Sequence, residues 1–502
     1  WHFVPTFTHV RGTHEFKFGV DWRVLNPVAG PRVTTVSYSF GGMQRAINNQ
    51  LMSTSVQSFA PEVTFRFHNF SWYAQDTWRA TRRLTLTYGI RQEINPPPST
   101  ADGTLPFTLQ GLENPLTATL APAGTNMFET PKGAFAPRVG AAYLLREDGS
   151  TVLRGGFGIY YDLGYGQAVA GYTSYPFGAS RTIPGGAYPA TAEQVVPPTR
   201  AATFPVQADF YAFPDFQLPF TRQWNVTLEQ ALGTSSVVSV AYVGNQGRRL
   251  SARTLLSNRT NSVRINPEIF ANFARIFVFN NDAKSDYHAL QAQFRKAMSR
   301  GLQVQAAYTW GKALDEVSAE DIDGLPQENL GFAINRGRAN FDIRHNFTAA
   351  VVYDLPSGYA NPVARAILGG WGADAFLRFR TAGRRLNAAA FTAPPSTRQG
   401  VLGRNSIDGL NSLQQVDLSL RRNFALGEEV GLEFRGELCN VFNTPSFGNP
   451  QFRLNNAQFG LATNMLADSL GGFGVGGSAL GFAPIFQIGG PRNVQLSLRL
   501  RF

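Results

Sequence analysis

The chain has 502 residues and a formal net charge of +11, and it contains no run of eighteen consecutive apolar residues. A membrane-spanning helix needs about 20 such residues, so the sequence argues against a helical membrane protein. The single cysteine, Cys439, excludes an internal disulfide framework and a cysteine metal site. The basic residues are scattered, with no basic run or recognition helix, which argues against a nucleic-acid partner.

Strands are predicted in pairs. A short turn joins the two members of each pair, except that the medium turn 356–369 joins 344–355 to 370–382. The clearest turn is Asp148-Gly149, a combination that favours a tight hairpin. In chain order the predicted pairs are 2–10 with 14–24, 67–78 with 84–93, 134–145 with 151–162, 222–231 with 235–244, 285–296 with 301–313, 344–355 with 370–382, and 414–424 with 429–442, and 493–502 follows as a fifteenth strand.

The connections between pairs are long and rich in Gly, Pro, Asn and Ser. Strict alternation of short and long connections is typical of an antiparallel transmembrane β-barrel with short periplasmic turns and long extracellular loops. The all-β barrel is therefore the expected fold, as a single domain over residues 1–502. The predicted long connections are 25–65, 95–133, 163–221, 245–284, 314–343, 383–413 and 443–492.

Alternation within the strands predicts two different faces, because side chains two residues apart lie on the same side of a strand. In 493–502 one set is apolar and the other polar, which assigns the apolar set to lipid and the polar set to the lumen. The expected lipid-facing residues of this strand are Val494, Leu496, Leu498, Leu500 and Phe502. The expected lumen-facing charges are Glu433, Arg435, Glu437, Arg499 and Arg501.

The alternation of connections also predicts a strand direction. If Phe502 ends at the periplasm, every short connection is periplasmic and every long one extracellular. Val33 to Phe40 resembles a strand but breaks this parity, so we place it in the loop 25–65 or in an extension above the membrane. The first and last of fifteen strands then run the same way, and the sheet is expected to be open or imperfectly closed, with exposed edges.

Several segments together resemble Oar-like TonB-dependent outer-membrane proteins, and the resemblance covers nearly the whole chain. The clearest is 440–450, NVFNTPSFGNP. The others are WYAQDTW at 72–78, RLTLTYGIR at 83–91, QWN at 223–225, AYVGN at 241–245 with GR at 247–248, YHALQ at 287–291, AYTWGK at 307–312 and FDIRH at 341–345.

The resemblance implies a signal peptide, a carboxypeptidase-like β-sandwich, a plug domain with a TonB-contacting box, and a barrel of 22 strands. This sequence begins at Trp1 within strand-like sequence, so we expect a fragment that holds fifteen strands and lacks the plug and the first seven. The terminal aromatic strand resembles the signal that the barrel-assembly machinery reads.

Energy-dependent uptake of a bulky substrate in an outer membrane is the function that the resemblance implies, with TonB acting through the missing plug. The substrate is not encoded in the loops, and no enzyme activity or cofactor is expected. A passive porin-like channel or a surface adhesin without TonB coupling is the alternative function. A soluble all-β enzyme or lectin is a third, weaker alternative.

Individual residues suggest two further roles. Trp72, Trp78, Trp224 and Trp310 fit an interfacial aromatic girdle, with a stacking site for a sugar or aromatic ligand as the alternative. An acidic cluster in 314–343 includes Asp321 and Asp323, a weak calcium candidate that lacks the rest of an EF-hand loop. Gly155 to Gly158 lies inside a strand, so it is not expected to bind a dinucleotide.

Overall fold

The fold is known from a computed structural model of the chain. It describes residues 1–30, 33–60, 62–111, 117–163, 172, 176–198, 208–213, 216–256, 273–318, 333, 336–356, 358, 360–381, 412–426, 430–447, 461 and 490–502. The structure is almost entirely β-sheet, as the alternating sequence predicts. No described helix is both long and apolar enough to cross a membrane.

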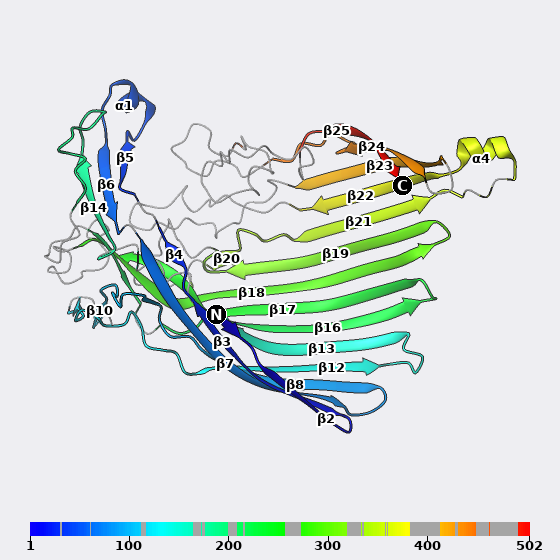
Figure 1. Cartoon of the computed structure of the whole chain (residues 1–502), viewed down its shortest axis with the longest axis horizontal. Coiled ribbons are helices and arrows are strands. Elements are labelled where there is room, and N and C mark those ends of the chain that lie inside the picture. The colour runs from blue at the N-terminus through cyan, green and yellow to red at the C-terminus, as the bar shows by residue number, and fades with distance from the viewer. Residues whose placement is uncertain are drawn as a thin grey trace.

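A large curled sheet dominates the molecule (Figure 1) and comprises twenty strands in the described residues. Five are short pieces: β1 (His2–Phe3), β4 (Val28–Ala29), β9 (Ser99–Thr100), β15 (Ala208–Ala212) and β20 (Gly337–Arg338). The fifteen long strands are β2 (Thr6–Arg11), β3 (His14–Leu25), β7 (Val63–Arg79), β8 (Leu84–Ile94), β12 (Ala134–Leu144), β13 (Thr151–Tyr161), β16 (Phe220–Leu232), β17 (Ser236–Leu256), β18 (Phe273–Ser299), β19 (Leu302–Asp315), β21 (His345–Asp354), β22 (Trp371–Arg380), β23 (Leu413–Ala425), β24 (Gly431–Cys439) and β25 (Asn493–Arg501).

These fifteen strands coincide with the fifteen that the sequence predicts. Each pairs antiparallel with its neighbour along the chain, and the short connections gather at one end of the sheet while the long ones gather at the other (Figure 1). We call these the short-turn end and the long-loop end. Gly149, at φ 72°, closes one short turn, a conformation that glycine adopts without strain. The 356–369 turn contains helix α4 (Pro362–Leu368), which Asn361 caps.

The sheet does not close through its first and last strands. Among the described residues, β1 and β2 pair only with β3, and β25 pairs only with β24. The predicted open sheet is therefore confirmed for the part of the chain that the structure describes. Within the described residues, both edges leave backbone N–H and C=O groups without a strand partner, which is costly inside a membrane.

Of two predicted loop assignments, the structure agrees with one and not with the other. Val33 to Phe40 is correctly excluded from the large sheet, since β5 (Thr35–Ser39) joins β6 (Ser53–Phe59) and β14 (Gly178–Pro184) in a separate small sheet beside helix α1 (Met43–Ile47). The prediction that 245–284 forms a loop was wrong, because β17 and β18 continue through most of this segment. Bulges between Gly247 and Ala252 interrupt the alternation there, so the sequence pattern fades while the backbone pairing persists.

A compact apolar core stands at the long-loop end, where the connections fold over one another. Phe65 and Phe67 of β7, Phe277 and Phe279 of β18, and Tyr172 belong to it. The Tyr172 side chain is fully buried and its hydroxyl donates to the Pro98 carbonyl at 2.5 Å, while burial raises the pKa of its phenol. Nearby, β10 (Leu109–Gln110) and β11 (Thr119–Leu120) form a short separate ladder.

Candidate functional site

The strand register sorts side chains onto two faces, because directly opposed residues share a side of the sheet. Val226 of β16 is opposite Tyr242 of β17, which is opposite Leu290 of β18 and, through it, Trp310 of β19. We call the side that holds these residues the apolar face. Its side chains are open to the surroundings, with Val226 53% and Trp310 51% exposed. The opposite side, which holds Asn225 and Gln291, is the polar face.

The last strand follows the same division. Leu496 and Leu498 are 69% exposed on the apolar face, opposite Gly436 and Phe434 of β24, and Phe502 is 97% exposed at the short-turn end. Val494 and Leu500 lie on the same side, opposite Leu438 and Leu432. The apolar set predicted for this strand is thus brought together on one surface, with no protein packed over it among the described residues.

Charged side chains form a connected network on the polar face of β21 to β25. Arg421 forms ion pairs with Asp354 and, through Nε, with Asp374 Oδ1 at 3.3 Å. Arg435 approaches Asp374 Oδ2 at 3.6 Å and holds Glu437 Oε1 at 2.8 Å. Because Arg421 and Arg435 are directly opposed, the carboxylates between them offset their repulsion. We call this group the C-terminal charge network.

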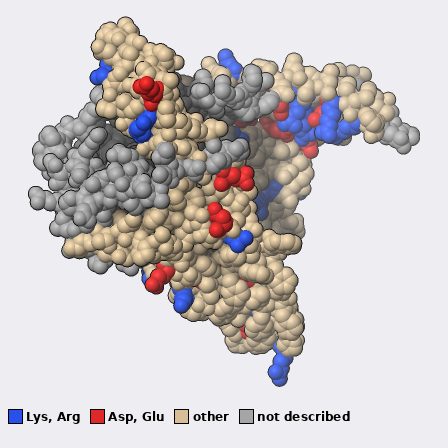
Figure 2. Space-filling model, turned by 60° about the vertical axis from the view of Figure 1, so that its left-hand side comes forward, with Lys and Arg blue, Asp and Glu red and all other residues tan. Residues whose placement is uncertain are grey.

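The remaining predicted charges lie beside this network on β24 and β25. Glu433 forms an ion pair with Arg501 and lies directly opposite Arg499. All five charges named from the sequence therefore occupy the polar face. Blue and red atoms gather at the upper right of Figure 2, over the C-terminal strands, while tan covers most of the remaining visible surface.

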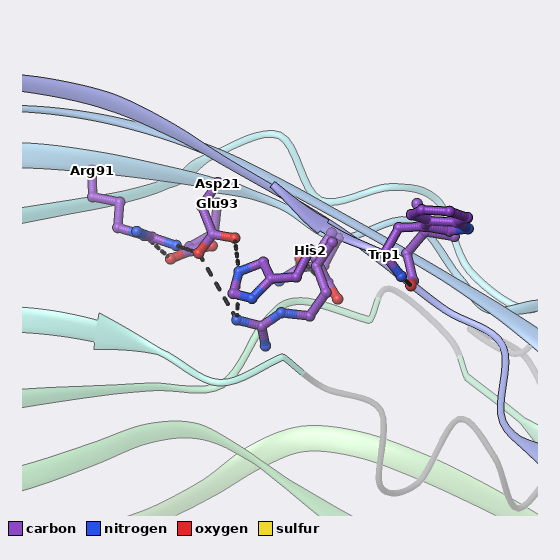
Figure 3. Close-up of polar contacts among 9 residues, drawn as sticks. Trp1, His2, Asp21, Arg91 and Glu93 are labelled. Carbon is purple, nitrogen blue, oxygen red and sulfur yellow. Dashed lines mark hydrogen bonds and ion pairs between the residues drawn. The ribbon is translucent and has the colours of Figure 1, made fainter. Parts of the chain in front are cut away.

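A second charged group lies on the polar face near the other edge of the sheet (Figure 3). Arg91 of β8 binds Asp21 Oδ2 at 3.0 Å and Glu93 Oε1 at 2.5 Å, and His2 Nε2 lies 2.9 Å from Asp21 Oδ1. Arg23 stands 3.4 Å from the His2 ring nitrogen. The sequence pattern did not predict this cluster, although its charged residues occupy alternate positions in their strands: Asp21 and Arg23 in β3, Arg91 and Glu93 in β8.

Between the two charged groups the polar face is lined by amides and glycines. A hollow of about 600 Å³ lies over Gly156 and Gly158 of β13, with Gln223, Asn225 and Gln291 around it. A side chain at Gly158 would bring its Cβ to 3.0 Å from the Tyr160 ring, so glycine keeps this part of the wall open. The arrangement offers hydrogen-bond donors and acceptors, and Arg138 is the charged side chain among its lining residues.

The four predicted girdle tryptophans all lie on the apolar face, at two levels. Trp78 is next to the short-turn end of β7, whereas Trp72, Trp224 and Trp310 lie seven or eight residues from that end of their strands. With a rise of about 3.3 Å per residue and a tilt of about 40°, the six or seven residues between the two levels span roughly 15–18 Å. The apolar face therefore carries tryptophans at two heights along the strands.

One acidic residue on the apolar face was not predicted. Asp76 is 4% exposed, and its Oδ2 lies 2.7 Å from both His14 Nδ1 and the Tyr88 hydroxyl. The signal in the sequence is an acid at an otherwise apolar alternate position, between Ala74 and Trp78. Hydrogen bonding to two neighbours lowers the cost of burying the carboxylate on this face.

Asp321 and Asp323 of the calcium candidate lie outside the described residues. Elsewhere in the described part of the chain, no group of three or more His, Cys, Asp or Glu side chains is arranged to hold a metal ion. Two histidines bind tyrosines on the apolar face: His288 with Tyr242 and His345 with Tyr308, each at 2.8 Å.

A mainly antiparallel sheet with an exposed apolar face and a charged opposite face defines the wall of an outer-membrane β-barrel. The sequence profile described as "Outer membrane beta barrel domain" matches residues 1–384 and 380–470. The chain therefore belongs to this family, and its location is an outer membrane. No curated protein matches the sequence.

Several solved structures are similar to this chain at low sequence identity. The outer membrane transporter YddB from Escherichia coli matches with a TM-score of 0.54 and 12% identity, over 89% of this chain and 50% of that chain. The ferric-catecholate import receptor Fiu from K12 E. coli matches at 0.43 and 12%, over 88% and 50%. The ferripyoverdine receptor from Pseudomonas aeruginosa matches at 0.43 and 11%, over 88% and 51%. This chain spans about half the length of each.

Proposed function

We propose that the chain forms part of the wall of a TonB-dependent, Oar-like transporter that takes up a bulky substrate across the outer membrane. The observation that carries the proposal is the polar face, where two charged groups border an amide-lined hollow along a wide sheet. A large polar interior suits a substrate too big for a simple pore. In this proposal the apolar face contacts lipid and the girdle tryptophans mark its borders.

The proposal includes further strands that complete the barrel. Both sheet edges lack a strand partner in the described residues, and fifteen strands of a 22-stranded barrel leave seven to be supplied. A plug that contacts TonB would occupy the interior of the completed barrel. The paired charges on β21 to β25 favour a structured, hydrogen-bonding neighbour on this side of the wall.

The last strand is proposed to point toward the periplasm and to be recognised by the barrel-assembly machinery. Its support is the exposed apolar row that ends at Phe502. Because the Phe502 ring is 97% exposed, Phe502→Ala removes little packing within the chain. We expect several-fold less of the Phe502→Ala variant in the outer membrane, while its free energy of unfolding stays unchanged. Membrane fractionation measures this amount, and a matched Ser497→Ala variant is the control. Equal assembly of the two variants would contradict the recognition role.

Transport is tested with the whole gene product that contains this chain, expressed in its outer membrane. We expect uptake of its substrate to stop when TonB is deleted or the proton gradient is dissipated, while the amount of folded barrel stays constant. Candidate substrates are found by comparing the compounds taken up by cells with and without the protein. The passive-channel alternative makes the opposite prediction, namely solute flux into liposomes without TonB. Uptake that is independent of TonB would overturn the proposed coupling.

A further inference from the structure

A basic hollow of about 540 Å³ lies just beyond the upper tryptophan level. Its lining includes Phe220 and Arg222 of β16, Arg248 and Arg249 of β17, and Lys284 of β18. It is separate from the polar wall described above.

The register places this hollow on the apolar face. Phe220 of β16 is directly opposite Arg248 of β17. Arg222 lies two positions further along β16, and Trp224 lies four positions further. Trp224 and Val226 belong to the apolar face, so the alternate positions Arg222 and Phe220 continue it toward the long-loop end. Arg222 and Arg248 therefore project to the same side as the tryptophan, rather than into the hollow of the polar wall, and Arg249 reaches that side against the Phe220 ring.

The change from apolar to basic is abrupt along β16. Val226 and Leu228 are exposed on the apolar face, Trp224 follows, and Arg222 is the next residue on that side. Arg222 stands ten residues from Leu232, which corresponds to about 25 Å at a strand tilt of about 40°. The apolar band of such barrels is about 25 Å tall, so the cations begin where headgroups replace hydrocarbon.

The protein neutralises part of the positive charge in this region with its own carboxylates. Arg248 Nη2 binds Asp286 Oδ1 at 2.8 Å, and Arg336 pairs with the same carboxylate. Arg222, Arg249 and Lys284 have no ion pair among the described residues.

Two carboxylates also line the hollow, and neither forms an ion pair with these cations among the described residues. Glu316 Oε2 accepts the Lys284 backbone N–H at 2.9 Å, and Asp282 is exposed. The Phe220 ring lies 5.5 Å from the Arg222 guanidinium and 5.6 Å from that of Arg249, which keeps both groups at the hollow. The remaining surplus of positive charge suits a multivalent anion.

We propose that this hollow binds the phosphorylated headgroup of a lipid in the outer leaflet. Guanidinium groups form paired hydrogen bonds with phosphate oxygens, and Trp224 with Val226 offers an apolar surface directly below for the acyl chains. The inference rests on the proposed assignment of the apolar face to lipid and is independent of TonB coupling. It specifies one place on the barrel where lipid is held by charge as well as by hydrophobic contact.

The test uses the full gene product reconstituted in phosphatidylcholine vesicles, with and without diphosphorylated lipid A. The variant Arg222→Gln/Arg249→Gln/Lys284→Gln removes three charges from the hollow. The matched control Arg295→Gln/Arg378→Gln/Arg499→Gln removes three charges from the polar face. Lipid A retained per protein after repurification is measured by mass spectrometry. Each headgroup-level cation is worth roughly five-fold in affinity, so the hollow variant is expected to bind on the order of 100-fold more weakly, and the control unchanged.

Further measurements distinguish a lipid headgroup from free phosphate as the group that is bound. Lipid A without its phosphates should bind as weakly to the native protein as lipid A binds to the hollow variant, and inorganic phosphate alone should not compete at equal concentration. Equal retention by the hollow variant and the native protein, or competition by free phosphate, would overturn the proposal. Failure of the underlying face assignment has a different signature, because the protein would then not enter vesicles or show heat-modifiable gel mobility at all.

Discussion

Val226→Arg is expected to destabilise the membrane-inserted protein by about 2–4 kcal/mol, the cost of an arginine near the bilayer midplane on the lipid side of a barrel. Val226 is on the apolar face, six residues from Leu232, which corresponds to about 15 Å above the short-turn end. The apolar band is about 25 Å tall, so this position lies near its middle. Denaturant titration of the protein in vesicles measures the free energy of unfolding and tests this expected loss.

The neighbouring position supplies the control. Asn225 is on the polar face beside Gly156 and takes part in the amide-lined hollow. Asn225→Arg introduces the same charge at the same height, and we expect its unfolding free energy to stay within about 0.5 kcal/mol of the native value. If the two arginine variants were equally destabilised, the assignment of the apolar face to lipid would be wrong.

Arg421→Gln is expected to lower the unfolding free energy by about 1–3 kcal/mol, because it leaves Asp354 and Asp374 without their shared cation. The Arg421 and Asp374 side chains are 18% and 19% exposed, so solvent screens the pair only in part. Asp354 is about half exposed and contributes less. The loss should appear as earlier unfolding in a denaturant titration of the reconstituted protein.

A second substitution distinguishes the loss of the ion pairs of Arg421 from the loss of its packing. Adding Asp374→Asn to Arg421→Gln removes one of the two carboxylates that lost their ion pair with Arg421, so the double variant should recover part of the lost stability. Arg499→Gln serves as the matched control, since Arg499 is exposed on the same face and forms no ion pair among the described residues. Comparable loss from Arg499→Gln would show that the network has no special role.

Local sequence predicted the strands and their turns well, because both depend on neighbouring residues. Apolar and charged residues alternate at Leu432, Glu433, Phe434 and Arg435, which predicts a strand, and Asp148-Gly149 predicts a tight turn. The same reasoning failed at 245–284, where β17 and β18 extend past bulges. A bulge shifts the period by one residue, so alternation no longer reports a strand whose hydrogen bonds continue.

The candidate site was predicted only in part. Alternation identified Glu433 and Arg435 as residues of the polar face, but it contains no information on which strand faces which. The ion pairs of Asp374 with Arg421 and Arg435 join β22 to β23 and β24, and those partners depend on register. Asp76 and its two partners come from β7, β3 and β8, so only pairing between distant segments reveals why an acid is tolerated there.

The sequence by itself determined an all-β chain of fifteen long strands, each with one apolar and one polar side, because side-chain direction follows the two-residue period of the backbone. Tertiary structure alone decided which charges meet, where the amide-lined hollow forms, and that the arginines of β16 and β17 gather above Trp224. Those arrangements depend on interstrand register and on loops that fold back over the sheet. Both bring together residues that are tens to hundreds of positions apart, a separation that local periodicity does not encode.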